Sequence, residues 1–148
     1  MTTTAPALTG RGYHDIAVGE VLPEVAIPLT RTLIVATAIA TRDFQDVHHD
    51  PELARERGSK DVFMNILTSN GLAGRFVTDW AGPFATVRRV KIRLGAPNYP
   101  GDTMTMTGAV VSKDNGLVEV KVQGANSLGN HLSGTVTVSY PAGEGKGA

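Results

Sequence analysis

From Pro83 onward the sequence repeats one pattern, an alternation of apolar and polar residues with a period of two. This period is typical of a β-strand that buries one face and exposes the other. Four segments carry it, at residues 90–94, 104–110, 118–122 and 132–140. The second half of the chain must therefore form an antiparallel sheet with one apolar face, and an element from the first half has to cover that face.

The candidate cover is a long helix at residues 62–80. Apolar and small residues recur there at three- and four-residue spacing, at Phe63, Ile66, Leu67, Asn70, Ala73, Val77 and Trp80. This spacing predicts one face of a helix. Gly71 and Gly74 lie inside the segment, where each costs about 1 kcal/mol relative to alanine, so we expect a close packing contact there. Gly82 and Pro83 end the helix.

The first third contains shorter elements. Residues 16–29 are interrupted by a glycine and a proline, which predicts a short strand entered through a turn. Thr32 is a suitable cap for a helix at residues 33–43. Pro51 suits the first turn of a helix at residues 52–57, which Gly58 ends.

Turn signals connect the strands and complete the fold prediction. Residues 114–116 read Asp-Asn-Gly, a strong hairpin signal, and residues 128–130 predict a second turn. We expect an antiparallel meander against one long helix, an α+β architecture in a single domain over residues 15–140. Residues 1–14 are expected to form a flexible arm, and residues 141–148 a flexible tail.

Composition excludes several functions. Fourteen Lys and Arg residues balance fourteen Asp and Glu residues among 148, which argues against a nucleic-acid binder. The chain has no cysteine, so disulfides, thiolate metal sites and a cysteine nucleophile are excluded. We find no signal peptide and no apolar run long enough to span a membrane, and we expect a cytoplasmic protein.

A polar cluster between the two short helices is the main candidate for chemistry. Asp43 and His48 lie five residues apart, and a carboxylate with a neutral imidazole can act as a general acid/base pair. The plainer interpretation is that such residues cap helices, as Asp50 before Pro51 would. We interpret His49 as a surface or packing residue. A metal site built from Asp46, His48, His49 and Asp50 is disfavoured, because the spacing matches no common ligand set.

Other motifs are sparse. The sequence has neither GxGxxG nor GxxxxGK[ST], and no GxSxG nucleophile elbow. A basic stripe at Arg88, Arg89, Lys91 and Arg93 is either the solvated face of a strand or a surface that meets the phosphates of a nucleotide carrier. His131 is interpreted as a turn or surface residue.

Two motifs resemble those of the MaoC-like (R)-specific enoyl-CoA hydratases. The first is DFQDVHHDPELA, with Asp43, His48, Asp50-Pro51 and Ala54 on the family pattern, and the second is YPGDT at residues 99–103. The resemblance implies a hot-dog fold, in which a curved sheet wraps a central helix. Over residues 40–82 the chain looks most similar to the small MaoC-like subunits of actinobacterial steroid side-chain hydratases.

The resemblance implies hydration of a 2-enoyl-CoA to the 3-hydroxyacyl-CoA, with Asp43 and His48 activating water. It places oxyanion or substrate binding at Asn65 and Ile66, and CoA phosphates near the basic stripe. No separate cofactor is implied, because CoA is part of the substrate. Many family members have His-Gly where this chain has Met64-Asn65.

For assembly, the resemblance implies a homodimer, or a heterotetramer with a larger subunit that carries a MaoC-like domain. Two rival functions remain at this point. The chain is either a non-catalytic acyl-CoA-binding subunit or, less favoured, a hot-dog thioesterase. The thioesterase usually carries its acid on the central helix, and no acid lies between Val62 and Thr78.

Overall fold

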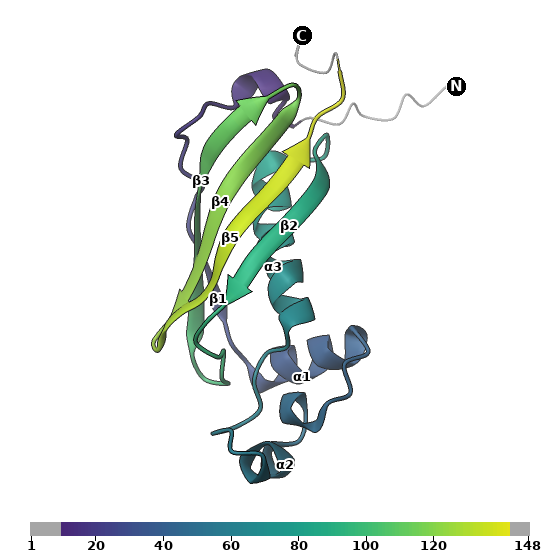
Figure 1. The fold of residues 1–148 in the computed structure, drawn as a ribbon, viewed down its shortest axis with the longest axis vertical. Coiled ribbons are helices and arrows are strands. Elements are labelled where there is room, and N and C mark those ends of the chain that lie inside the picture. Colours follow the sequence, from purple (N-terminus) through teal and green to yellow (C-terminus); the bar gives the residue numbers. More distant parts are fainter. Residues whose placement is uncertain (1–9, 143–148) are drawn as a thin grey trace, which may run out of the picture.

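The computed structural model describes residues 10–142, and these form one layer of strands against one layer of helix (Figure 1). The expected arm and tail fall largely on residues 1–9 and 143–148, which lie outside the described residues. In chain order the elements are η1 (Tyr13–Asp15), β1 (Val25–Pro28), α1 (Arg31–Ala40), η2 (Asp46–His48), α2 (Pro51–Glu56), α3 (Ile66–Ala81), β2 (Thr86–Leu94), β3 (Thr103–Asp114), β4 (Leu117–Asn126) and β5 (Gly129–Ser139).

The sheet is antiparallel, as the alternation predicts, and its strand order is β1-β3-β4-β5-β2. Of the strands in the described residues, β3, β4 and β5 form a meander. The prediction that all four strands after Pro83 follow one another in space is wrong for β2, which pairs with β5 along the far edge. The loop at residues 95–102 carries the chain from β2 across the end of the sheet to β3.

The turn prediction at residues 114–116 is confirmed. Asn115 and Gly116 have φ angles of 50° and 76°, and they join β3 to β4. Asn-Gly adopts this pair of positive φ angles at little cost, which is why the motif fixes the hairpin.

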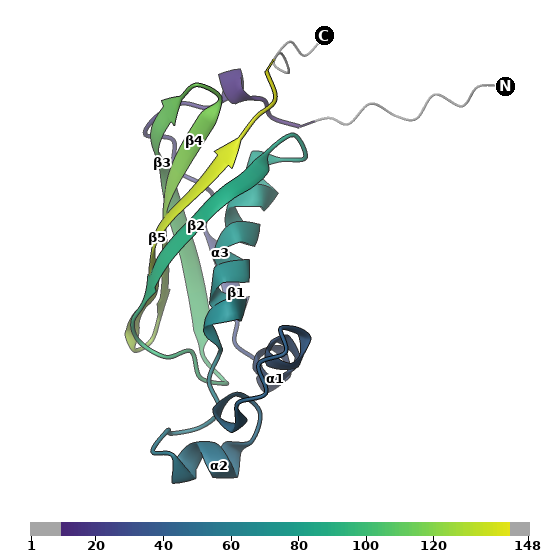
Figure 2. The ribbon, with the colours of Figure 1, turned by 45° about the vertical axis from the view of Figure 1, so that its right-hand side comes forward.

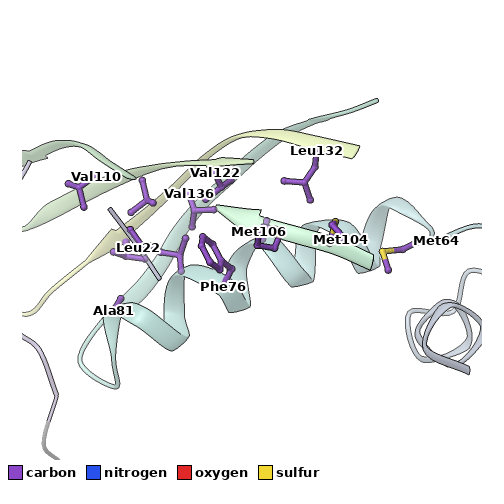
Figure 3. Packing of buried hydrophobic residues seen from close by; sticks show 14 of the residues in the cluster. Leu22, Met64, Phe76, Ala81, Met104, Met106, Val110, Val122, Leu132 and Val136 are labelled. Atoms are coloured by element: carbon purple, nitrogen blue, oxygen red, sulfur yellow. The ribbon is translucent and has the colours of Figure 1, made fainter. Parts of the chain in front are cut away.

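The sheet curves around α3, which lies along its inner face (Figure 2). The inward positions of the strands form the core, as the alternation predicts, and Met104, Met106, Val120 and Val136 are fully buried. Figure 3 shows Phe76 of α3 among the side chains of β3, β4 and β5. One helix therefore seals one curved sheet, which is the α+β arrangement expected.

Helix α3 begins four residues later than the sequence pattern predicts, and its buried face is rotated. Ile66 and Leu67 are about half exposed, whereas Thr68 and Ser69 are buried. Hydrogen bonds satisfy these two hydroxyls, so polar residues occupy inward positions that the apolar pattern could not reveal.

The close contact expected at the two helix glycines is also wrong. A Cβ at Gly71 would meet nothing within 4 Å, and one at Gly74 would meet only Val90 at 3.9 Å. The tight positions are in the sheet instead. A Cβ at Gly134 would lie 2.0 Å from the Lys91 carbonyl oxygen, because β5 and β2 approach each other closely there.

The two short helices differ little from prediction. Helix α1 is capped by Thr30, whose hydroxyl accepts from the Leu33 N–H at 3.0 Å, rather than by Thr32, and it ends at Ala40 instead of Asp43. Asp50 caps α2 as predicted, since its carboxylate accepts from the N–H groups of Glu52 and Leu53.

Candidate active site

The turn after α1 places Asp43 at the N-terminal end of α3. Arg42 has φ = 58°, and the Asp43 N–H donates back to the carbonyl of Ala38 at 3.0 Å. A left-handed residue followed by this bond is a common way to stop a helix and satisfy its last carbonyls. The short helix η2 then presents His48 to the same space.

Asp43 and His48 face each other, as the five-residue spacing suggests. The distance from Asp43 Oδ2 to His48 Nε2 is 3.5 Å, and the two side chains are 20% and 9% exposed. Nδ1 of His48 lies 2.7 Å from the carbonyl oxygen of Phe63. Because that oxygen only accepts, Nδ1 carries a proton, and Nε2 is the ring nitrogen that faces Asp43.

The ring of His48 is fixed from a second side. It packs edge-to-face against Phe63, with centroids 4.9 Å apart, and Phe63 N–H in turn donates to the Val47 carbonyl. The segment before α3 thus holds both the imidazole and the backbone of η2. Such support reduces the number of rotamers the imidazole can adopt.

Asn65 caps α3 and also reaches Asp43. Its Oδ1 accepts from the Thr68 N–H at 3.0 Å and from the Thr68 hydroxyl. Its Nδ2 donates to Thr41 Oγ1 at 2.9 Å and to Asp43 Oδ2 at 3.1 Å. The residue is 1% exposed, so this amide is a buried part of the site. The sequence places Asn65 inside the helix, although an Asn before an apolar run is a recognisable cap signal.

The first backbone N–H groups of α3 make no hydrogen bond in the part of the chain that the structure describes. Within residues 10–142, the backbone N–H groups of Asn65 and Ile66 have no hydrogen-bond acceptor. Met64 N–H, by contrast, donates to the carbonyl of Asn98 at 3.1 Å. A helix N-terminus with free donors is suited to stabilise a developing negative charge.

A buried pair that the sequence analysis missed supports this helix end. His131 is 2% exposed, so the prediction of a turn or surface position is wrong. Its Nδ1 donates to the Ala96 carbonyl and its Nε2 lies 2.7 Å from Ser69 Oγ. Burial lowers the pKa of His131, partly offset by the Ala96 bond. A histidine at a strand start gave no sequence signal for this role.

The basic stripe is not part of the Asp43 site within this chain. Arg88, Arg89, Lys91 and Arg93 are all exposed on β2, while the alternate residues, such as Val90, pack toward α3. Arg89, Lys91 and Arg93 therefore project from the outer face of the sheet. Arg88 donates to Ser139 Oγ at 2.7 Å.

Three further properties of the described residues concern metal ligands, membrane-spanning helices and surface hollows. In residues 10–142, no three His, Asp or Glu side chains are grouped so as to hold a metal ion. No helix in that part of the chain has the length and apolar character needed to cross a membrane. A hollow of about 450 Å³ lies beside the loop, lined by Phe44, Gln45, Asp46, Val47, His49 and Arg57. Neither Asp43 nor His48 lines it.

A curved antiparallel sheet around one long helix, with an Asp–His pair at the helix N-terminus, defines a hot-dog-like domain of the dehydratase class. The chain belongs to the family with a MaoC like domain, whose model matches residues 16–130. The matched residues include the loop of residues 43–54 and helix α3.

A close relative is the 3-oxo-4,17-pregnadiene-20-carboxyl-CoA hydratase beta subunit of Mycobacterium tuberculosis. It is 54% identical over 122 residues, which cover 82% of this chain and 95% of that protein. Among solved structures, the ChsH1-ChsH2 complex from M. tuberculosis contains a chain with 53% identity and a TM-score of 0.82, covering 84% of this chain and 98% of that one.

More distant structures share the fold. The R-hydratase PhaJ1 from Pseudomonas aeruginosa has a TM-score of 0.80 at 20% identity, over 89% of this chain and 86% of that one. At this identity the likeness concerns the backbone arrangement alone.

Proposed function

We propose that this chain is the catalytic subunit of a heteromeric enoyl-CoA hydratase that acts on a steroid side-chain thioester of the kind named for its M. tuberculosis relative. The observation that carries the proposal is the approach of Asp43 Oδ2 to His48 Nε2, 3.5 Å apart at the N-terminus of α3. The 54% identity to a hydratase beta subunit supports the substrate class.

The reaction adds water across the conjugated double bond. Asp43 Oδ2 and His48 Nε2 both contact one water molecule that lies to the side of the pair, and the Nε2 lone pair of His48 accepts its proton as the oxygen bonds to the β carbon. The same proton then passes from His48 to the α carbon, so the enzyme ends unchanged. The ionised Asp43 stabilises the intervening imidazolium.

After water has added to the β carbon and before the α carbon is protonated, negative charge lies on the thioester oxygen. The free N–H groups of Asn65 and Ile66 are the donors assigned to it. They belong to the first turn of α3, whose helix dipole favours negative charge at that end. Asn65 serves this role through its backbone, so the absence of glycine at this position does not remove the donor.

The partner in the proposal is a second hot-dog subunit. Among the strands of residues 10–142, β2 pairs with β5 and its other edge is open, and Ile66 and Leu67 of α3 are 52% and 49% exposed. An open strand edge and exposed apolar side chains beside a site both favour association. We assign CoA phosphate contacts to Arg88, Arg89, Lys91 and Arg93, which lie on and beside this edge.

The test uses the chain co-expressed with its partner subunit. Loss of the enoyl-thioester absorbance measures hydration, and release of free CoA would instead indicate a thioesterase. Asp43→Asn and His48→Asn should each lower kcat by about 10²–10⁴-fold, as expected for loss of general acid/base action. Asp50→Ser and His49→Asn are the matched controls on the same loop. Full activity of either site variant would refute the assignment of that residue.

A further inference from the structure

Asn65 has an amide orientation that its surroundings fix. The Thr68 N–H at 3.0 Å can only donate, so the atom it meets must be Oδ1. The NH2 group is then the end that points back toward the turn after α1. The cap of α3 thus decides where the two N–H donors of Asn65 lie.

Both donors are used on that turn. One goes to Thr41 Oγ1 at 2.9 Å and the other to Asp43 Oδ2 at 3.1 Å. Oδ2 is also the oxygen that faces His48 Nε2. Because Nδ2 donates to it, Oδ2 acts as an acceptor on the side of Asn65, and its position is tied to the first turn of a rigid helix.

We infer that Asn65 is a positioning residue for the hydration reaction, which holds the Asp43 carboxylate at the distance and orientation that the His48 imidazole requires. The inference rests on the proposed function of the Asp43–His48 pair and adds a third side chain to it. It differs from the oxyanion role, which belongs to the backbone N–H of the same residue.

The hydrogen bonds to the Asp43 carboxylate show how much of its position depends on the Asn65 side chain. Asp43 receives one other hydrogen bond within the described residues, from Gln45 N–H to Oδ1 at 3.4 Å. Oδ1 is therefore weakly held, and the bond from Asn65 is the shorter restraint on the carboxylate. Without it, Asp43 can rotate away from His48 about its side-chain bonds.

Two variants separate positioning from capping. Asn65→Ser keeps a good helix cap but is too short to reach Asp43. Asn65→Asp keeps both the cap and the length, but replaces the donor with a second carboxylate beside Asp43. Thr30→Ala is the control for a comparable loss of capping. It removes the N-terminal cap of α1, whereas Asp43 follows the C-terminal end of that helix.

The experiment measures kcat, KM and the pH–rate profile with the partner subunit and the pregnadiene-carboxyl-CoA substrate. We expect Asn65→Ser to lower kcat by about 10- to 100-fold with little change in KM, the usual effect of one hydrogen bond to a charged group. For Asn65→Asp we expect the acid limb of the profile to move to higher pH, because two adjacent carboxylates share a proton. Thr30→Ala should retain the wild-type kcat and profile.

A double variant distinguishes this inference from the proposed function. If Asn65 acts through Asp43, Asn65→Ser should add little to the loss already caused by Asp43→Asn. Wild-type kcat and pH profile in both Asn65 variants, while Asp43→Asn is inactive, would overturn the role of Asn65 and leave the proposed function intact. An active Asp43→Asn would overturn the proposed function itself.

Discussion

The buried His131 makes the stability of this fold depend on pH in a defined window. His131 is 2% exposed, and burial lowers its pKa. Its imidazole is therefore protonated less readily in the folded protein than in the unfolded chain. Between its unfolded pKa of about 6.5 and the lower folded value, the unfolded state binds more protons. The free energy of unfolding should therefore fall as pH falls below about 6.5, by at most about 1.4 kcal/mol per pH unit.

The carboxylates with lowered pKa values lose their contribution at lower pH than this window. The groups with lowered pKa values, such as Asp61 at about 2, contribute stability above their unfolded pKa and lose it only in stronger acid. Urea unfolding of the chain at pH 7.5 and pH 5.5 thus measures the histidine contribution.

The variant that isolates this effect is His131→Gln, which keeps a polar atom near Ser69 but does not titrate. It should be less stable than wild type at neutral pH by about 1–3 kcal/mol, because the Ala96 carbonyl loses its donor. The difference should shrink toward pH 5.5. The reasoning fails if the wild type and His131→Gln lose stability in parallel between the two pH values.

Three further outcomes can be measured by chemical or thermal unfolding. Phe76→Ala should lose about 3–5 kcal/mol, since the ring is 6% exposed and fills the space between α3 and the sheet; a loss below 1 kcal/mol would contradict this packing. Gly134→Ala should lose about 1–3 kcal/mol, because the new Cβ would meet the backbone of β2, whereas Gly71→Ala should be neutral or stabilising. Asp61→Asn should be less stable than wild type at pH 7, and the deficit should shrink as pH falls from about 5 toward the Asp61 pKa of about 2, which the Arg31 guanidinium lowers; a difference that persists unchanged at pH 2 would contradict the ion pair.

The fold class was accessible from the sequence because strand alternation is local. The apolar residues at the inward positions of β3, β4 and β5 are buried, with half-buried glycines at Gly108 and Gly134, and the Asn115–Gly116 turn is where it was expected. The partner of β2 was not accessible. Strand order depends on how a loop crosses the sheet, and residues 95–102 contain no sign of which edge β2 joins.

The candidate site also contains both residues that the sequence predicts and contacts that only the tertiary structure shows. The sequence alone brings Asp43 and His48 within one short loop, and their type and spacing suggest a shared role. Two contacts depend on the tertiary structure. Asn65 is the cap of α3, and its side-chain amide donates to Asp43. His131 and Ser69, 62 positions apart in the sequence, are hydrogen-bonded to each other. These are contacts between elements distant in the chain, and hydrogen-bond satisfaction in the buried interior, rather than any local pattern, selects them.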